Sequence, residues 1–203
     1  MNAPRLLVFL KAPRPGFVKT RLARDLDAEA AAGIHRVLVE RTLARVAAHP
    51  DVELRFAPDD AESEVKSWQR AGWRLRPQGP GDLGTRLSAA TAEAFAEGSS
   101  RVLVIGSDCP DIEREDLRAA EEALSRYDVV LGPAEDGGYW LLGLRAPQPA
   151  LFRDIAWGTS TVLTQTCERA RSAGLEVHEL RRLRDIDTLE DWRAWLRSGF
   201  PAS

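Results

Sequence analysis

Short apolar runs and longer amphipathic stretches alternate along the whole chain. Runs of Val, Leu and Ile such as the one at 102–105 are typical of strands buried on both faces of a sheet. Between such runs, apolar residues recur at helical spacing, as Ile34, Val37 and Leu38 do. The pattern predicts strands at 6–10, 52–57, 73–76, 102–105, 128–131, 139–144 and 175–180, and helices at 28–48, 60–70, 85–96, 113–126, 161–173 and 189–196.

This alternation is typical of α/β proteins, in which helices cover both faces of a mainly parallel sheet. The strands at 128–131 and 139–144 are joined by a Gly137-Gly138 turn instead of a helix, so we expect a local β excursion there. The chain shows no internal repeat, linker or low-complexity segment. The sequence therefore predicts one α/β domain over residues 1–203.

Composition narrows the class of partner. The 203 residues are 44% hydrophobic and 29% charged, with a net charge of −3 at pH 7, which argues against nucleic acid or an anionic membrane surface as the main partner. Met1 stands almost directly before the first strand and no apolar run approaches the length of a membrane span, so we expect no signal peptide. With only Cys109 and Cys167, the chain fits a reducing compartment and a cytoplasmic location.

A cationic loop follows the first predicted strand. It carries Lys11, Arg14, Lys19 and Arg21 together with Gly16, although it lacks the first glycine of a Walker A loop. Backbone amides, bidentate Arg and the point charge of Lys suit phosphate oxygens. The alternative is a solvated loop that pairs with surface carboxylates. Its place after the first strand of an α/β sheet favours phosphate binding.

Three aspartates are candidate metal ligands. Asp108 follows the strand at 102–105, where ligands bind in open α/β sheets, and a carboxylate there suits Mg²⁺. Asp185 and Asp187 stand two apart, so in an extended segment they lie on one face and can converge on one ion. The alternatives are a turn or cap at Asp108 and a helix cap at Asp187. Together with the cationic loop, the three acids favour a Mg²⁺–phosphate site.

Two further groups of residues could contact substrates. Gly81, Asp82 and Gly84 stand between a strand and a helix, where glycines allow close approach of a base or phosphate, although Asp82 could simply cap the helix. A second group could hold an acceptor hydroxyl or anion, or could form an ordinary turn and helix cap. That group comprises Asp136, Gly137, Gly138, Tyr139, Gly158 and Ser160.

Other chemistries lack support. The three histidines share no metal-like spacing with the cysteines, and we expect His35 and His49 on one surface helix. No serine elbow and no dinucleotide fingerprint occurs, and Cys109 fits a small buried residue better than a nucleophile. Trp68 and Trp195 could mark a dimer surface, although lone aromatic residues more often pack locally.

The motifs, in this order, resemble the nucleotide-diphospho-sugar transferase superfamily, and in particular the group called glycosyltransferase or rSAM/selenodomain-associated transferase 1. The first loop is also similar to that of the 2-phospholactate/phosphoenolpyruvate guanylyltransferases. The motifs are Lys11-Ala12-Pro13, Val18-Lys19-Thr20-Arg21-Leu22, Gly81-Asp82-Leu83-Gly84, Gly106-Ser107-Asp108-Cys109-Pro110-Asp111, Asp136-Gly137-Gly138-Tyr139 and Asp185-Ile186-Asp187-Thr188.

The resemblance implies a GT-A-like, Rossmann-like three-layer α/β/α sandwich with a mostly parallel mixed sheet. In the guanylyltransferases an Asp-x-Pro aspartate and a later Asp-x-Asp pair hold metal, which maps to Asp108, Asp185 and Asp187. Their acceptor's acid group meets a Gly/Ser turn that resembles Gly158 and Ser160. The Gly81–Gly84 loop differs from the guanylyltransferase equivalent, so base and acceptor stay open.

We therefore expect a Mg²⁺-dependent transferase, with Mn²⁺ as the alternative ion, that moves a nucleotidyl group from an NTP to a small phosphorylated or acidic acceptor and releases pyrophosphate. Lys11, Lys19 and Arg21 would neutralise the developing charge. The first alternative is a glycosyltransferase that uses an NDP-sugar, and the second is a non-catalytic nucleotide-binding domain. The expected partners are a nucleotide donor and a small acceptor, and a homodimer stays open.

Overall fold

One mixed sheet organises the protein. In the computed structural model, which describes residues 3–199, seven strands lie in the order β3-β2-β1-β4-β6-β5-β7. Neighbouring strands are parallel, except that β6 is antiparallel to both β4 and β5. The strands are β1 (Arg5–Lys11), β2 (Val52–Ala57), β3 (Arg74–Pro77), β4 (Val102–Ile105), β5 (Val129–Pro133), β6 (Tyr139–Leu144) and β7 (Val177–Glu179).

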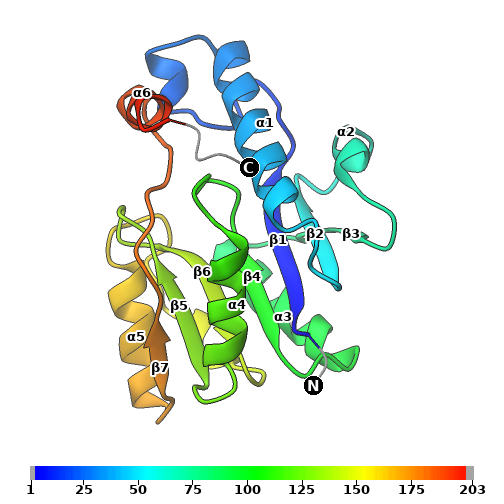
Figure 1. Cartoon of the computed structure of the whole chain (residues 1–203), viewed down its shortest axis with the longest axis vertical. Helices are drawn as coiled ribbons and strands as arrows, with labels where there is room; N and C mark the ends of the chain where they lie inside the picture. The colour runs from blue at the N-terminus through cyan, green and yellow to red at the C-terminus, as the bar shows by residue number, and fades with distance from the viewer. Residues whose placement is uncertain (1–2, 200–203) are drawn as a thin grey trace.

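Helices cover both faces of this sheet (Figure 1). Apolar side chains of α1, α2 and α4 form one buried cluster with the sheet, and those of α3 and α5 form another on the opposite face. All four residues of β4 are buried, as expected for a strand covered on both sides. The helices are α1 (Ala28–Arg45), α2 (Glu62–Val65), α3 (Leu83–Ala96), α4 (Arg114–Ala123), α5 (Val162–Ser172) and α6 (Leu189–Arg197), with 3₁₀ turns η1 (Leu22–Arg24), η2 (Lys66–Trp68) and η3 (Pro149–Phe152).

The β excursion predicted after β5 is present. Strand β6 returns antiparallel to β5 and inserts between β4 and β5, with a register shift at Gly132 and Pro133. The mixed three-layer sandwich expected from the sequence is therefore confirmed. No helix in the described part of the chain combines the length and apolar composition needed to cross a bilayer.

The last helix docks away from the sheet. Helix α6 lies beside α1 (Figure 1), where Leu38, Ile186 and Trp195 form a separate buried cluster. The Trp195 indole Nε1 donates a hydrogen bond to Asp111 Oδ1 at 2.9 Å. Because α6 is anchored there, the segment that precedes it must cross the end of the sheet.

Two expectations from the sequence are wrong. The helix expected at 60–70 is the single-turn α2 followed by η2. His35 lies on the inner side of α1 and is 3% exposed, and His49 lies beyond the end of that helix at Arg45. Trp68 and Trp195 are 8% and 5% exposed, so both pack locally, which is the alternative that the sequence favoured. Burial of Cys109 is confirmed.

Candidate active site

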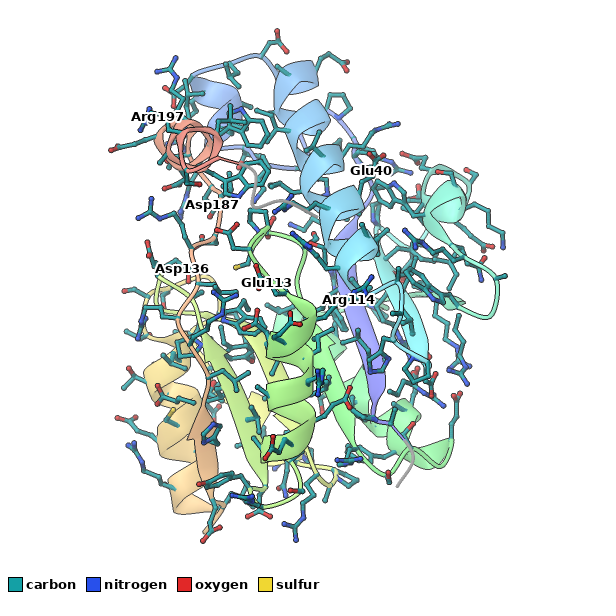
Figure 2. All side chains as sticks on the ribbon, viewed as in Figure 1. Glu40, Glu113, Arg114, Asp136, Asp187 and Arg197 are labelled. Atoms are coloured by element: carbon teal, nitrogen blue, oxygen red, sulfur yellow. The ribbon has the colours of Figure 1, made fainter. Side chains whose placement is uncertain are left out.

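A cavity of about 540 Å³ opens where the strands end. Strands β1 and β4 are parallel neighbours, so the loops that follow both reach the same edge of the sheet. In Figure 2, Asp136 and Asp187 lie between α6 and this edge. The charged side chains that line the cavity are the cations Lys11, Lys19 and Arg21 and the carboxylates Asp108, Asp136, Asp185 and Asp187.

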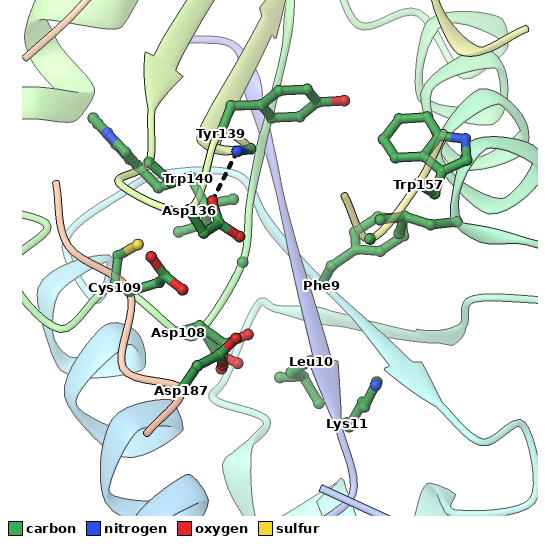
Figure 3. A pocket seen from close by; sticks show the side chains of 18 of the residues that line it. Phe9, Leu10, Lys11, Asp108, Cys109, Asp136, Tyr139, Trp140, Trp157 and Asp187 are labelled. Atoms are coloured by element: carbon green, nitrogen blue, oxygen red, sulfur yellow. Dashed lines mark hydrogen bonds between the residues drawn. The ribbon is translucent and has the colours of Figure 1, made fainter. Parts of the chain in front are cut away.

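Lys19 lies at the centre of the charged part of the cavity. Its Nζ is 2.5 Å from Asp108 Oδ1 and 3.1 Å from Asp187 Oδ1, and it donates to the carbonyl oxygen of Ile186 at 2.5 Å. The side chain is only 4% exposed. Figure 3 shows the carboxylates of Asp108 and Asp187 next to each other, on the side of the cavity away from Trp157. We call these three oxygens, around one ammonium, the oxygen cage.

The cage shifts the pKa values of its members. Burial acts to lower the pKa of Lys19, but the charges of Asp108 and Asp187 outweigh it and raise that pKa above its usual value. Partial desolvation in the cavity acts to raise the pKa of Asp108, whose side chain is 51% exposed, but the adjacent Lys19 charge outweighs it and holds that pKa below the usual range. Both groups are therefore charged at neutral pH.

Asp185 and Asp136 extend the acidic side of the cavity. Burial and the negative charges of Asp136 and Asp187 raise the pKa of Asp185 to about 6. Asp136 is oriented by its own turn, because its Oδ1 accepts a hydrogen bond from the backbone N–H of Gly138 at 2.7 Å. Carboxylates thus outnumber their cationic partners here, which is the electrostatic setting of a cation site.

Two further cations remain open to a ligand. Arg21 is 64% exposed and lies 3.6 Å from Asp187, a loose contact compared with that of Lys19. The side chain of Lys11 is exposed at the end of β1. The backbone carbonyl of Lys11 accepts from His35 Nε2 at 3.0 Å, and burial lowers the pKa of His35, so this histidine is a neutral support for the loop.

Arg14 and Gly16 lie outside the cavity lining. The Arg14 guanidinium pairs with Glu64 in α2 at 2.5 Å and with Asp60 just before α2 at 3.1 Å. The cations of this loop therefore lie in two places. Lys11, Lys19 and Arg21 line the cavity, whereas Arg14 pairs with surface carboxylates. The phosphate-binding role predicted for Arg14 and Gly16 stays a prediction.

The glycine-rich loop before α3 has a local structural role. The Asp82 side chain accepts from Thr85 N at 2.8 Å and caps the helix, which is the alternative that the sequence left open. A Cβ on Gly84 would lie 2.4 Å from Nε1 of Trp157, so this glycine lets the indole pack against the helix. Neither Gly81, Asp82 nor Gly84 lines the cavity, and their role in nucleotide binding stays a prediction.

The predicted acceptor residues divide into lining and support. Asp136, Gly138, Tyr139 and Gly158 line the cavity. Gly137 and Ser160 lie behind them, where the two loops touch through their backbones: a Cβ on Gly137 would be 2.1 Å from the Ser160 carbonyl oxygen. This contact holds the two loops in place.

Rings and one amide complete the lining. The Tyr139 and Trp157 rings meet edge to face with centroids 6.4 Å apart, across the cavity from Asp108 (Figure 3). Gln78 is buried and its Nε2 donates to the carbonyls of Leu10 and Arg55, both at 3.0 Å. The sequence patterns mark no functional role for Gln78 or His35. For Gln78, its position directly after a strand was the signal that could have found it.

The donor set fits a hard divalent cation. Within residues 3–199, no three His, Cys, Asp or Glu side chains are grouped closely enough to hold a metal by themselves. Mg²⁺ does not need such a group, because it commonly takes one or two carboxylates together with substrate phosphates. The oxygen cage already surrounds the positive charge of Lys19 with two carboxylates and a carbonyl. Its ammonium therefore occupies the kind of position that a metal ion would take.

Known proteins resemble this chain over nearly its whole length. A phosphoenolpyruvate guanylyltransferase from Chloroflexus aggregans is 29% identical over 195 residues, which cover 86% of this chain and 93% of that protein. A 2-phospho-L-lactate guanylyltransferase from Methanothermobacter thermautotrophicus is 28% identical over 177 residues, covering 85% and 76%. A crystal structure from Desulfovibrio desulfuricans G20, of a protein assigned as a nucleotide-diphospho-sugar transferase, is 36% identical with a TM-score of 0.92, covering 100% and 90%.

The fold and these relatives define the class: the chain is a transferase of the GT-A-like superfamily, either a nucleotidyltransferase or a glycosyltransferase. Within that class it belongs to the family described as "Uncharacterized protein conserved in bacteria (DUF2064)", whose model matches residues 41–159. A more distant protein from Mycobacterium tuberculosis H37Rv, 20% identical with a TM-score of 0.55 over 97% of this chain, shares the fold and was crystallised with manganese.

Proposed function

We propose that this protein transfers a nucleotidyl group from an NTP to a small acceptor that carries a phosphate or carboxylate, and that it releases pyrophosphate. The observation that carries the proposal is the juxtaposition of the exposed cations Lys11 and Arg21 with the oxygen cage in one cavity. The names of the two guanylyltransferase relatives support the same reaction.

The reaction needs no covalent enzyme intermediate. An acceptor oxygen attacks the α-phosphorus of the NTP, and the bond from that phosphorus to the oxygen bridging to the β-phosphate breaks. Its electron pair leaves with pyrophosphate. Negative charge grows on the leaving group, and Lys11 and Arg21 neutralise it, Arg21 with the bidentate geometry that suits phosphate oxygens. Positioning and electrostatics supply most of the rate in such transfers.

Mg²⁺ or Mn²⁺, when bound, supplies further neutralisation of the phosphate oxygens. Asp108 and Asp187 would hold the ion, with Asp185 beside them in the same cavity. On the other side, the backbone N–H of Gly138 orients Asp136, and the rings of Tyr139 and Trp157 line the cavity, where they would shield a bound acceptor from water.

Glycosyl transfer from an NDP-sugar is the second candidate. It is favoured by one observation, the 36% identity to a structure assigned as a nucleotide-diphospho-sugar transferase. The two reactions differ in their leaving group, which is pyrophosphate from an NTP and a nucleoside diphosphate from an NDP-sugar.

The deciding experiment measures the leaving group. The protein is incubated with Mg²⁺, each of the four NTPs, and either phosphoenolpyruvate or 2-phospholactate as acceptor. We expect acceptor-dependent release of pyrophosphate with one preferred NTP. Release of a nucleoside diphosphate from an NDP-sugar, with no pyrophosphate from any NTP, would replace our proposal with the second candidate.

A matched pair of variants tests the assignment of Asp108. Asp108→Asn keeps the shape of the side chain and removes its charge, so turnover should fall by about 10²-fold or more, the usual cost of losing one electrostatic contact to a transition state. Glu122→Gln makes the same change on the exposed side of α4, where the carboxylate is 78% exposed, and should leave turnover unchanged. Equal turnover in the two variants would remove Asp108 from the site.

A further inference from the structure

The oxygen cage holds an ammonium where the chemistry of the cavity calls for a metal ion. The three oxygens around Lys19 Nζ come from Asp108, Asp187 and the backbone of Ile186. An ammonium has three hydrogens to donate, so these contacts satisfy it completely. Carboxylate and carbonyl oxygens are equally the ligands that Mg²⁺ and Mn²⁺ prefer.

The backbone at Lys19 is unusual for its residue type. Its φ of +48° lies in the left-handed region, which a residue with a Cβ adopts at a cost. Such conformations persist when surrounding contacts hold them, and they occur at sites that change conformation. Here the contacts of the ammonium with the cage hold the loop together with the adjacent Val18, because the Lys19 side chain is 4% exposed and Val18 is 2% exposed.

We propose that Lys19 is an internal, exchangeable counter-ion: its ammonium closes the oxygen cage while no divalent cation is bound, and it leaves the cage for the donor phosphates when the cation enters. The second half of this proposal rests on the proposed function, whereas the exchange with the metal does not.

Competition between the two cations follows from their charges. Mg²⁺ binds carboxylate oxygens at about 2.0–2.1 Å, and the ammonium lies 2.5 Å from Asp108 Oδ1 and 3.1 Å from Asp187 Oδ1, so an ion on the same oxygens would lie within about 5 Å of the ammonium. Positive charges this close repel each other. The flexible stem of a lysine lets its ammonium move while the loop stays attached.

The exchange would couple metal binding to donor binding. A released Lys19 ammonium belongs to the same loop as the exposed cations Lys11 and Arg21, so it would join them at the phosphates. Before metal binding, the same ammonium keeps Asp108 and Asp187 from repelling each other and preserves the shape of the site. The contrasting view is that Lys19 is a permanent structural ion pair, without which the two carboxylates separate.

Metal affinity distinguishes these views, because they predict opposite signs. The first experiment measures Mn²⁺ binding to the nucleotide-free protein by electron paramagnetic resonance. If Lys19 fills the cage most of the time, Lys19→Met should tighten Mn²⁺ binding by about tenfold, because apparent affinity scales with the fraction of the competent state. Lys11→Met removes the same charge from the same cavity without touching the cage, and should change Mn²⁺ binding far less. Unchanged or weaker binding in Lys19→Met would overturn the proposal.

A second measurement uses the unaltered protein. The amines are acetylated with a lysine-specific reagent, with and without saturating Mg²⁺, and the labelled positions are found by mass spectrometry. Lys19 should be protected without Mg²⁺ and become reactive with it, while Lys66, which is 60% exposed, should react equally in both. Protection of Lys19 that persists at saturating Mg²⁺ would overturn the exchange.

The outcomes separate this proposal from the proposed function. If Mn²⁺ binding and acetylation behave as expected but no NTP is turned over, the exchange stands and nucleotidyl transfer fails. If NTPs are turned over but Lys19→Met leaves the Mn²⁺ affinity unchanged, nucleotidyl transfer stands and the exchange fails. Pyrophosphate binding in saturating Mn²⁺ tests whether Lys19 moves to the donor phosphates. Pyrophosphate should bind more weakly to Lys19→Met than to the unaltered protein. Equally tight binding would show that Lys19 does not reach the phosphates.

Discussion

The contact between Gly137 and the backbone of Ser160 predicts an unusually costly glycine substitution. Gly137 has a φ of +89°, and a Cβ placed on it would meet the Ser160 carbonyl oxygen at 2.1 Å and the Ser160 Cα at 2.7 Å. Backbone atoms cannot rotate away as a side chain can, so Gly137→Ala must push apart the two loops that line the acceptor side of the cavity. Gly158 has a similar φ of +79° but nothing within 4 Å of its Cβ position.

The pair of alanine variants isolates the steric part of the cost. In both variants, a Cβ in the left-handed region lowers the free energy of unfolding by about 1–2 kcal/mol. In both, restriction of the unfolded chain raises it by the same amount, about 0.4–1 kcal/mol. Gly137→Ala alone adds the overpacking cost of about 1–3 kcal/mol. We therefore expect its free energy of unfolding to fall below that of Gly158→Ala by this last amount.

Urea unfolding followed by far-ultraviolet circular dichroism gives the free energies of both variants and of the unaltered protein. The slope with urea should be unchanged, which makes the difference in midpoints a difference in stability. Equal losses in the two variants would refute the reasoning, because they would mean that the loops separate without cost or are not in contact.

Three further results are expected. Chelation of divalent cations with EDTA should abolish pyrophosphate release and excess Mg²⁺ or Mn²⁺ should restore it; turnover that survives chelation would contradict a metal at the cage. Trp195→Phe removes the 2.9 Å hydrogen bond to the Asp111 carboxylate and should lower the free energy of unfolding by about 1.5–3 kcal/mol in urea titrations; no loss would mean that α6 docks by packing alone. Burial lowers the pKa of His35, so the unfolded chain binds the proton more readily and stability should fall as the pH drops below about 6.5; His35→Gln should flatten that dependence, and an unchanged slope would assign it to other groups.

The order of strands and helices was predictable because it depends on local pattern. Fully apolar runs mark strands covered on both faces, and a glycine turn in place of a helix marks the β5–β6 pair. The placement of Lys11 near Asp108 was predictable for a related reason, since the ends of parallel strands meet at one edge. That the chain is one domain and that it is cytoplasmic stay predictions, and a homodimer stays open.

The tertiary structure decided which charges meet. Lys19 and Arg14 are cations of one loop, yet Lys19 is buried between Asp108 and Asp187 while Arg14 pairs with Glu64. Asp187 reaches this position because α6 packs on α1 and because the backbone N–H of Ile186 donates to the carbonyl of Asp108 at 2.9 Å. The sequence alone determined the sheet and the edge where the chemistry lies, because both follow from short-range periodicity. The pairing of charges depends on contacts between residues far apart in the chain, and only packing settles those.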